Sequence, residues 1–400
     1  MIRWGKTKIV ALVAVLLIAG TSLWWWQRVR TQRLAELRDA VIAAFAAGDW
    51  DEAARLSGDW TDAQPESGEA WVRHANALSM TGEHEQALAA LERVPPTFER
   101  LTEVKETRLN LLLRDLHRPF ECRSACERLL EDEPRNETAL GLLIYIDAML
   151  LDIPQLSENL RRALAASVET PDHYVYLMML DNFALINGDA VTAQWLEEAP
   201  ENVVLQAAHA VHTQDRLRLL QVKEASAENR AQLAAAIARV EELATDSPQD
   251  ARLLRSRVLT ALADGKVDVL RQLLTIASET SQAEAVCLRA RAFVHLADGD
   301  TDAADSCIQQ ALQQHPLSFE CRAMHSDILR RQGRRDAASA LQTLAMTGTK
   351  IRETISAMTS VTDATPGLLR RIANYARECE DWETAAALER RLPLAGASGP

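Results

Sequence analysis

The chain has 400 residues, of which 48% are hydrophobic, enough to bury a sizeable core and to exclude disorder for most of its length. It contains only 15 glycines and 13 prolines, so turns are few and the elements between them are long, which favours helices over a many-stranded sandwich or barrel. Acidic residues outnumber basic ones by 57 to 44, and a surface of this charge repels phosphate, which argues against nucleic acid as a partner.

The first feature along the chain is an apolar stretch between two basic groups. Residues 9–27 carry no charged side chain, and a helix of this length extends about 28 Å, close to the thickness of a hydrocarbon layer. The indole rings of Trp24, Trp25 and Trp26 suit a headgroup region and argue against signal cleavage beside them. We therefore predict a transmembrane helix at residues 9–27 after a basic tail at residues 1–8. The alternatives are a cleaved signal peptide or a buried helix of a soluble domain.

The charges that flank this stretch are only slightly asymmetric. The bias places the amino-terminal tail in the cytoplasm and the rest of the chain outside it. The predicted localisation is therefore a single-pass membrane protein with an extracytoplasmic body.

A period of 34 residues runs through the remainder of the chain. Three consecutive pairs of glycines are separated by this interval, and five of the six glycines that mark it have an alanine five residues later. The same phase continues without glycine at His117, Leu151 and Ala231. The marking glycines are Gly48, Gly82, Gly188, Gly265, Gly299 and Gly333.

The offsets within the period predict a helical hairpin. A glycine ends one helix in a left-handed turn, an acidic residue begins the next, and the following alanine allows the two helices to approach closely. Prolines such as Pro65 and Pro316 then stop the second helix. The predicted fold class is accordingly all-α.

These residues resemble the tetratricopeptide repeat family. Trp71, Gly82 and Ala87 match the tryptophan, the turn glycine and the second-helix alanine of its motif, whereas Ala75 replaces a first-helix glycine. The resemblance extends from Leu34 to about Leu392. It implies an α-solenoid of tetratricopeptide-like hairpins that binds a protein or peptide partner on its concave surface.

Two intervals in the register are longer than the repeat and divide the predicted array. The predicted parts are an amino-terminal array at residues 34–213, an inserted loop or extended helix at 214–229, a carboxyl-terminal array at 230–345, a spacer at 346–365, a terminal hairpin at 366–392 and a disordered tail at 393–400.

The cysteines give little sign of chemistry. Cys122 and Cys126 lie four residues apart on one predicted helix, where small apolar side chains fill a tight contact. If the body lies in an oxidising compartment, a disulfide between two of the residues Cys287, Cys307 and Cys321 is an alternative.

Other motifs that would indicate chemistry are also weak. His209, His212 and Asp215 are spaced along one helix face, and Cys321 and His325 are similarly placed, but neither group supplies a full zinc ligand set. The sequence has no phosphate-binding loop, nucleophile elbow or zinc-protease motif. We therefore expect no catalysis, no cofactor, no metal and no small-molecule substrate. A metal-dependent or hydrolytic enzyme on helical repeats remains the alternative.

The resemblance also places candidate partner-binding residues. In this family the groove-facing positions lie ten, six and three residues before the turn glycine. The position six residues before it holds, among others, Leu259 and Phe293. Apolar and amide side chains occupy the earlier repeats, and arginines that suit carboxylates occupy the later ones. The predicted partner-binding residues are Asn76, Tyr145, Met178, Asn182, Arg252, Arg255, Arg289 and Arg370.

The function predicted from these features is a membrane-tethered scaffold or assembly factor that binds a protein or peptide partner in its groove. A homo-oligomeric structural protein of the cell envelope is the other alternative.

Overall fold

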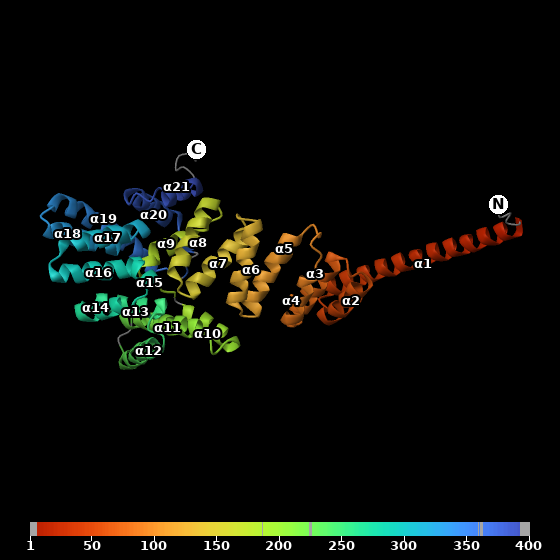
Figure 1. The fold of residues 1–400 in the computed structure, drawn as a ribbon, viewed down its shortest axis with the longest axis horizontal. Helices are drawn as coiled ribbons and strands as arrows, with labels where there is room; N and C mark the ends of the chain where they lie inside the picture. The colour runs from red at the N-terminus through yellow and green to blue at the C-terminus, as the bar shows by residue number, and fades with distance from the viewer. Residues whose placement is uncertain (1–5, 186, 224–225, 359, 361–362, 393–400) are drawn as a thin grey trace, which may run out of the picture. The chain divides into compact units, whose positions relative to one another are not determined.

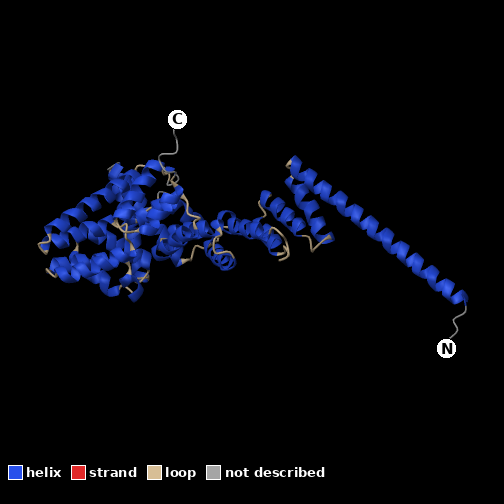
Figure 2. Ribbon diagram, turned by 90° about the horizontal axis from the view of Figure 1, so that it is seen from above, coloured by secondary structure: helices blue, strands red, loops and turns tan. Residues whose placement is uncertain are grey.

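A computed structural model of the chain describes the backbone of residues 6–185, 187–223, 226–358, 360 and 363–392. It describes the side chains of these residues except those of 6–20, 23 and 221–223. Every regular element in this part of the chain is a helix (Figure 2). The chain forms two compact units, residues 1–116 and residues 117–400 (Figure 1).

The first unit is a short series of antiparallel hairpins. Val41 near the end of its first helix packs with Trp60 and Ala70, so the last turns of that helix complete the first hairpin. The unit contains α1 (Lys6–Ala47), α2 (Trp50–Ala63), α3 (Gly68–Met80), α4 (His84–Glu92), α5 (Leu101–Asn110) and the π-helical turn η1 (Leu111–Asp115).

The first helix differs from the predicted arrangement. The apolar stretch does not form a separate span, because α1 continues without a break through Arg28, Arg30 and Arg33 into the packed turns of the first hairpin. Among the helices in the described residues, none is long and apolar enough to cross a membrane. The prediction of a transmembrane helix at residues 9–27, and with it that of a single-pass membrane localisation, is therefore wrong. Residues 1–5 of the predicted basic tail lie outside the described residues.

The second unit contains all the later helices. Its first part comprises α6 (Pro119–Asp132), α7 (Glu137–Met149), α8 (Ile153–Ala166), α9 (Pro171–Met179), the 3-10 turn η2 (Leu180–Asn182), α10 (Gly188–Glu198) and α11 (Val203–Lys223). Its second part comprises α12 (Ala227–Asp246), α13 (Ala251–Ala263), α14 (Val267–Ile276), α15 (Glu279–Ala283), α16 (Ala285–Asp298), α17 (Thr301–Gln314), α18 (Phe319–Arg331), α19 (Arg335–Ser356), α20 (Pro366–Glu378) and α21 (Trp382–Arg391).

The turns between helices follow the predicted register, even where glycine is missing. Five of the six marking glycines have φ between +67° and +83°. His117 and Leu151 adopt the same left-handed conformation at +51° and +54°, and Glu380 does so at +61° before the last hairpin. An aspartate follows several of these turns and accepts a hydrogen bond from the backbone N–H three residues later, as Asp300 does from Ala303. Turn and cap together set the hairpin, which confirms the prediction of an all-α fold of tetratricopeptide-like hairpins.

Two positions in the predicted register do not form turns. Gly188 begins α10, where the ring of His212 occupies the space beside it: a Cβ added to this glycine would lie 2.3 Å from the imidazole Nδ1. Ala231 lies inside α12, which Ser226 caps. The insertion predicted at residues 214–229 begins as part of α11, which continues to Lys223.

The end of the chain lies against the beginning of the second unit. The terminal hairpin, α20 and α21, contacts α9 and α8, and α19 also contacts α9 (Figure 1). The second half of this unit therefore packs on the first half. The predicted tail at residues 393–400 lies outside the described residues, as do three positions of the predicted spacer, 359 and 361–362.

The close approach at Gly188 yields a stability prediction. A Gly188→Ala variant should lose about 2 kcal/mol or more of unfolding free energy, because the new methyl group collides with the buried His212 ring. Gly141→Ala is the matched control, since Gly141 is also helical and an added Cβ meets nothing within 4 Å. Its unfolding free energy should equal that of the wild type or exceed it by up to about 1 kcal/mol. Urea denaturation followed by circular dichroism measures both, and equal values for the two variants would contradict the packing role.

Candidate functional site

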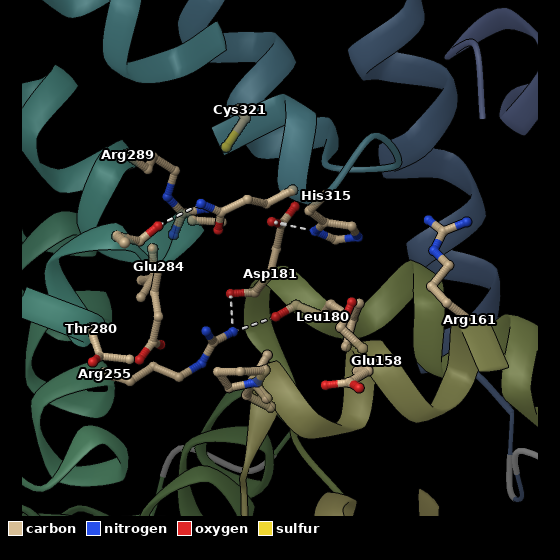
Figure 3. Close-up of a pocket in the computed structure, with 17 residues that line it drawn as sticks. Glu158, Arg161, Leu180, Asp181, Arg255, Thr280, Glu284, Arg289, His315 and Cys321 are labelled. Carbon is tan, nitrogen blue, oxygen red and sulfur yellow. Dashed lines mark hydrogen bonds and ion pairs between the residues drawn. The ribbon is translucent and has the colours of Figure 1, made fainter. Parts of the chain in front are cut away.

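A cavity of about 450 Å³ lies within the second unit, between the two halves that pack together (Figure 3). Helices α8, α13 and α16 form its walls with the η2 turn and the chain that joins α17 to α18. Aliphatic side chains such as Ile153 and Val286 make up much of the lining. The charged and polar residues that line it are Glu158, Arg161, Asp181, Thr280, Glu284, Arg255, Arg289, Gln314 and His315.

Arg255 is the most unusual of these groups. Its side chain extends from α13, and the residue is only 9% exposed. The Nη2 atom donates to the backbone carbonyl of Leu180 and to that of Asp181 at 3.1 Å (Figure 3). Carbonyls at the end of a helix carry partial negative charge and stabilise a nearby cation. Burial lowers the pKa of the Arg255 guanidinium.

Arg289 and His315, which also line the cavity, each lie beside a carboxylate. Arg289 forms an ion pair with Glu320. His315 Nδ1 lies 3.0 Å from a carboxylate oxygen of Asp181, and Nε2 lies 2.9 Å from the carbonyl of Leu177. Both ring nitrogens therefore lie within hydrogen-bond distance of an oxygen acceptor. Burial raises the pKa of Asp181, but His315, Arg289 and a hydrogen bond with Ser318 together hold that pKa below its usual range.

A second, larger cavity forms a groove beside the first. Its volume is about 610 Å³, and Leu259, Phe293 and Met324 line it from α13, α16 and α18. Asn182 and Arg289 also line it, so Arg289 contributes to both cavities. The groove therefore exposes apolar side chains from successive hairpins together with polar groups.

A third cavity, of about 450 Å³, is mainly apolar. Tyr145, Tyr176 and Met179 line it with residues from α11 and α19. The Tyr145 ring packs edge-on against Trp195, with the ring centroids 6.4 Å apart.

The structure brings some of the predicted partner-binding residues together and separates others. Arg255 and Arg289 share the first cavity, and Asn182 joins Arg289 in the groove. Met178 is only 1% exposed and belongs to the core. Arg252 donates from Nε to the carbonyl of Leu150 at 2.5 Å.

The two remaining predicted residues lie on the surface. Asn76 is exposed on α3 of the first unit, and Arg370 is exposed on α20 of the second. The partner-binding role of all eight predicted residues stays a prediction.

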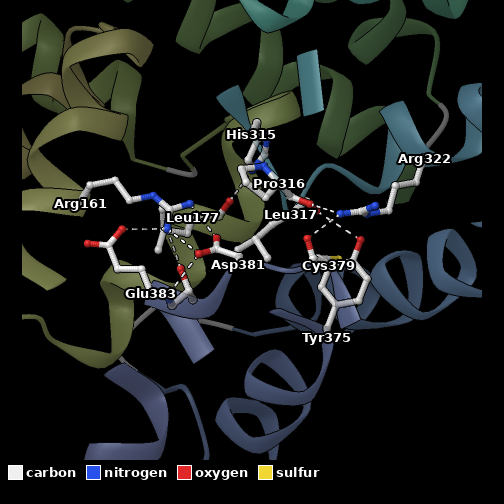
Figure 4. A network of polar contacts seen from close by, with 11 residues as sticks. Arg161, Leu177, His315, Pro316, Leu317, Arg322, Tyr375, Cys379, Asp381 and Glu383 are labelled. Carbon is white, nitrogen blue, oxygen red and sulfur yellow. Dashed lines mark hydrogen bonds and ion pairs between the residues drawn. The ribbon is translucent and has the colours of Figure 1, made fainter. Parts of the chain in front are cut away.

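A polar network beside the cavity holds the terminal hairpin in place (Figure 4). The two terminal nitrogens of Arg161 on α8 each donate at 2.7 Å to one oxygen of Asp381, the residue that caps α21. Arg322 donates to the carbonyls of Pro316 and Cys379, at 2.6 and 3.2 Å. The sequence offered no signal for this network, because Asp381 looks like every other capping aspartate in the register.

The histidines and cysteines considered above as possible metal ligands or disulfide partners do not form a metal site or a disulfide in the described residues. In the described residues, no group of three potential ligands lies close enough to hold a metal ion. His212 is fully buried and its Nε2 lies 2.9 Å from the carbonyl of Met149. The sulfur atoms of Cys122 and Cys126 lie 3.9 Å apart in the core, and all six cysteines are free thiols.

Comparison with known proteins identifies the repeat. A family model described as tetratricopeptide repeat matches residues 44–106, which include α2, α3 and α4. Among solved structures, a tetratricopeptide repeat protein from Parabacteroides merdae is 13% identical over 74% of this chain and 99% of that chain, with a TM-score of 0.31. Yeast Tom70 is 13% identical over 90% of each chain, with a TM-score of 0.28. At these scores the structural similarities carry no information about function. No curated protein matches the sequence.

Residues 44–106 thus match the tetratricopeptide repeat, and the rest of the described chain is a succession of further helices. Proteins of this class are helical repeat scaffolds that present extended surfaces to other proteins.

The buried histidine yields a pH prediction. Burial lowers the pKa of His212 to about 4 from an ordinary value of 6.5. The unfolded chain therefore binds an extra proton between these values, so the stability that depends on neutral His212 is present above pH 6.5 and is lost as the pH falls toward 4. On lowering the pH from 7 to 4, the wild type should lose roughly 3 kcal/mol more unfolding free energy than a His212→Gln variant. Denaturation at several pH values measures the difference, and parallel pH profiles would contradict it.

The network of Figure 4 yields a second prediction at this site. Arg161→Gln leaves the Asp381 carboxylate, 3% exposed, without its partner, so the terminal hairpin should open more easily. Hydrogen exchange of the α20 and α21 amides should accelerate at least tenfold. This corresponds to a decrease of about 1.4 kcal/mol in the free energy of local opening. Arg162→Gln, one residue along the same helix and exposed, should leave this exchange unchanged. Equal exchange rates in the two variants would show that the ion pair does not hold the hairpin.

Proposed function

We propose that this chain is a non-enzymatic scaffold or assembly factor that binds a segment of a protein partner in the groove along α13, α16 and α18. The proposal is supported by the repeat architecture, which places side chains from equivalent positions of successive hairpins in one row. Leu259 and Phe293 occupy the same position of two neighbouring repeats and both line the groove. A peptide lying across these helices would contact one repeat after another.

The chemistry of the groove suits a segment with both apolar and charged side chains. Phe293 and Met324 offer apolar contact area, which is the main source of affinity in protein interfaces. Charged side chains lie in the same lining, where Glu320 pairs with Arg289 and Arg218 lies 3.9 Å from Asp215, so a charged partner would have to fit this pattern of charges. A volume of about 610 Å³ accommodates several side chains. The apolar row supplies affinity, and the charged groups supply selectivity.

Site-specific crosslinking tests the proposal. A photoreactive phenylalanine in place of Phe293 keeps the aromatic ring in the groove, and the same residue in place of Gln309 reports from the exposed face of α17. In cells that produce the chain, illumination should join position 293, but not position 309, to a defined protein that mass spectrometry identifies. Absence of a crosslink from 293, or identical products from both positions, would contradict the proposal.

The partner identified in this way permits a quantitative test. Phe293→Ala should weaken its affinity at least tenfold, about 1.4 kcal/mol, because a buried aromatic anchor is lost. Gln309→Ala should bind as the wild type does. Calorimetric titration measures both affinities, and equal binding by the two variants would place the interface elsewhere.

A further inference from the structure

We propose that the cavity of Figure 3 binds a small monocarboxylic acid with an apolar body, and that Arg255 is the group that binds its carboxylate. This site goes beyond the proposed protein-binding groove, because a ligand in the cavity has no need to contact Phe293. The inference rests on the charge, the hydrogen bonding and the lining of the cavity.

The first step is a count of charges that face the cavity. Asp181 pairs with His315, Arg289 with Glu320, and Arg161 with Asp381. Each of these basic side chains already has a counter-charge within ion-pair distance. Among the described residues, no carboxylate lies within ion-pair distance of Arg255, and backbone carbonyls accept its hydrogen bonds. Glu284, which also lines the cavity, is the carboxylate that attracts this guanidinium most strongly.

The second step concerns the direction of the remaining donors. Nη2 of Arg255 donates to the carbonyls of Leu180 and Asp181, whereas Nε and Nη1 make no hydrogen bond to any described residue. The side chain lines the cavity, so these N–H groups are accessible from within it (Figure 3). A guanidinium presents paired N–H groups in the geometry that matches the two oxygens of a carboxylate.

The third step is the identity of the anion. One guanidinium that already attracts the carboxylate of Glu284 offers little further positive charge, which favours a singly charged carboxylate over a dianionic phosphate. The carboxylates of Glu284 and Glu158 also line the cavity, Glu158 being exposed, and further negative charge would meet their repulsion. Burial raises the pKa of Glu284, so this side chain gains a proton more readily than an exposed glutamate.

The fourth step is the shape of the ligand. Ile153, Pro154, Leu180 and Val286 give the cavity aliphatic walls, and a volume of about 450 Å³ exceeds what a bare carboxylate fills. An aliphatic or aromatic body attached to the carboxylate would bury apolar surface against these walls. The cavity is therefore suited to a compact acid of mixed character.

Titration of the full chain with hexanoate tests this site. Calorimetry should detect binding of hexanoate at micromolar to millimolar concentrations, and hexanamide, which has the same body without the charge, should bind at least tenfold more weakly. A short acetylated peptide ending in a leucine carboxylate distinguishes a free acid from a protein terminus. Binding of this peptide without binding of hexanoate would overturn the proposal, as would equal binding of hexanoate and hexanamide or no binding of either.

Three variants locate the site. Arg255→Gln should weaken hexanoate binding at least tenfold, whereas Arg257→Gln removes an arginine of the same helix that pairs with Glu241 instead and should change nothing. Glu284→Gln removes a like charge and should tighten binding several-fold, a gain that misfolding would not produce. Unchanged affinity in both Arg255→Gln and Glu284→Gln would overturn the assignment. The outcome is independent of crosslinking at Phe293, so the two proposals fail separately.

Discussion

The second unit depends on arginine and histidine side chains that form hydrogen bonds with backbone carbonyls of distant segments, most of them at the ends of helices. Arg252 reaches the carbonyl that follows α7, Arg255 and His315 reach those that end α9, and Arg391 reaches the carbonyl of Glu169. Helix ends leave carbonyls without partners inside the helix, and these carbonyls carry partial negative charge. Each contact therefore gives a carbonyl oxygen a polar partner, and at Arg255 it also offsets part of the cost of burying the charge. Together they hold the later hairpins against α7, α8 and α9.

This packing explains why the unit contains both a cavity lined by buried arginines and a neighbouring groove lined by apolar side chains. Stacked hairpins alone present one continuous concave surface. Here the earlier helices cover part of that surface and enclose the arginines that would otherwise face solvent, while the row at Leu259 and Phe293 stays accessible. Arg289 lies between the two environments and lines both. A scaffold with this construction has room for a protein segment and for a small ligand at adjacent places.

The sequence predicts contacts between neighbouring hairpins well and contacts between distant ones poorly. The period placed left-handed turns at His117 and Leu151 without glycine, because the local pattern of caps and apolar stripes determines them. Gly188 follows the same period but begins a helix, since the ring of His212 competes for its space. The apolar stretch at residues 9–27 suggested a separate span, whereas the structure has one helix that continues into the first hairpin. Arg255 was identified from its repeat position, but its partners lie some 75 residues away in sequence, beyond the reach of any periodic pattern.

The most direct test of this account is a distance measurement across the closed part of the second unit. Glu158 on α8 and Glu389 on α21 are exposed and lie on helices that contact each other, so spin labels carried by unnatural amino acids at these positions leave the six cysteines intact. Pulsed electron paramagnetic resonance on the full chain should give one narrow, short distance distribution. A broad distribution centred well beyond the separation of packed helices would show that the later hairpins do not fold back. It would contradict the packing between the two halves and the cavity that this packing creates.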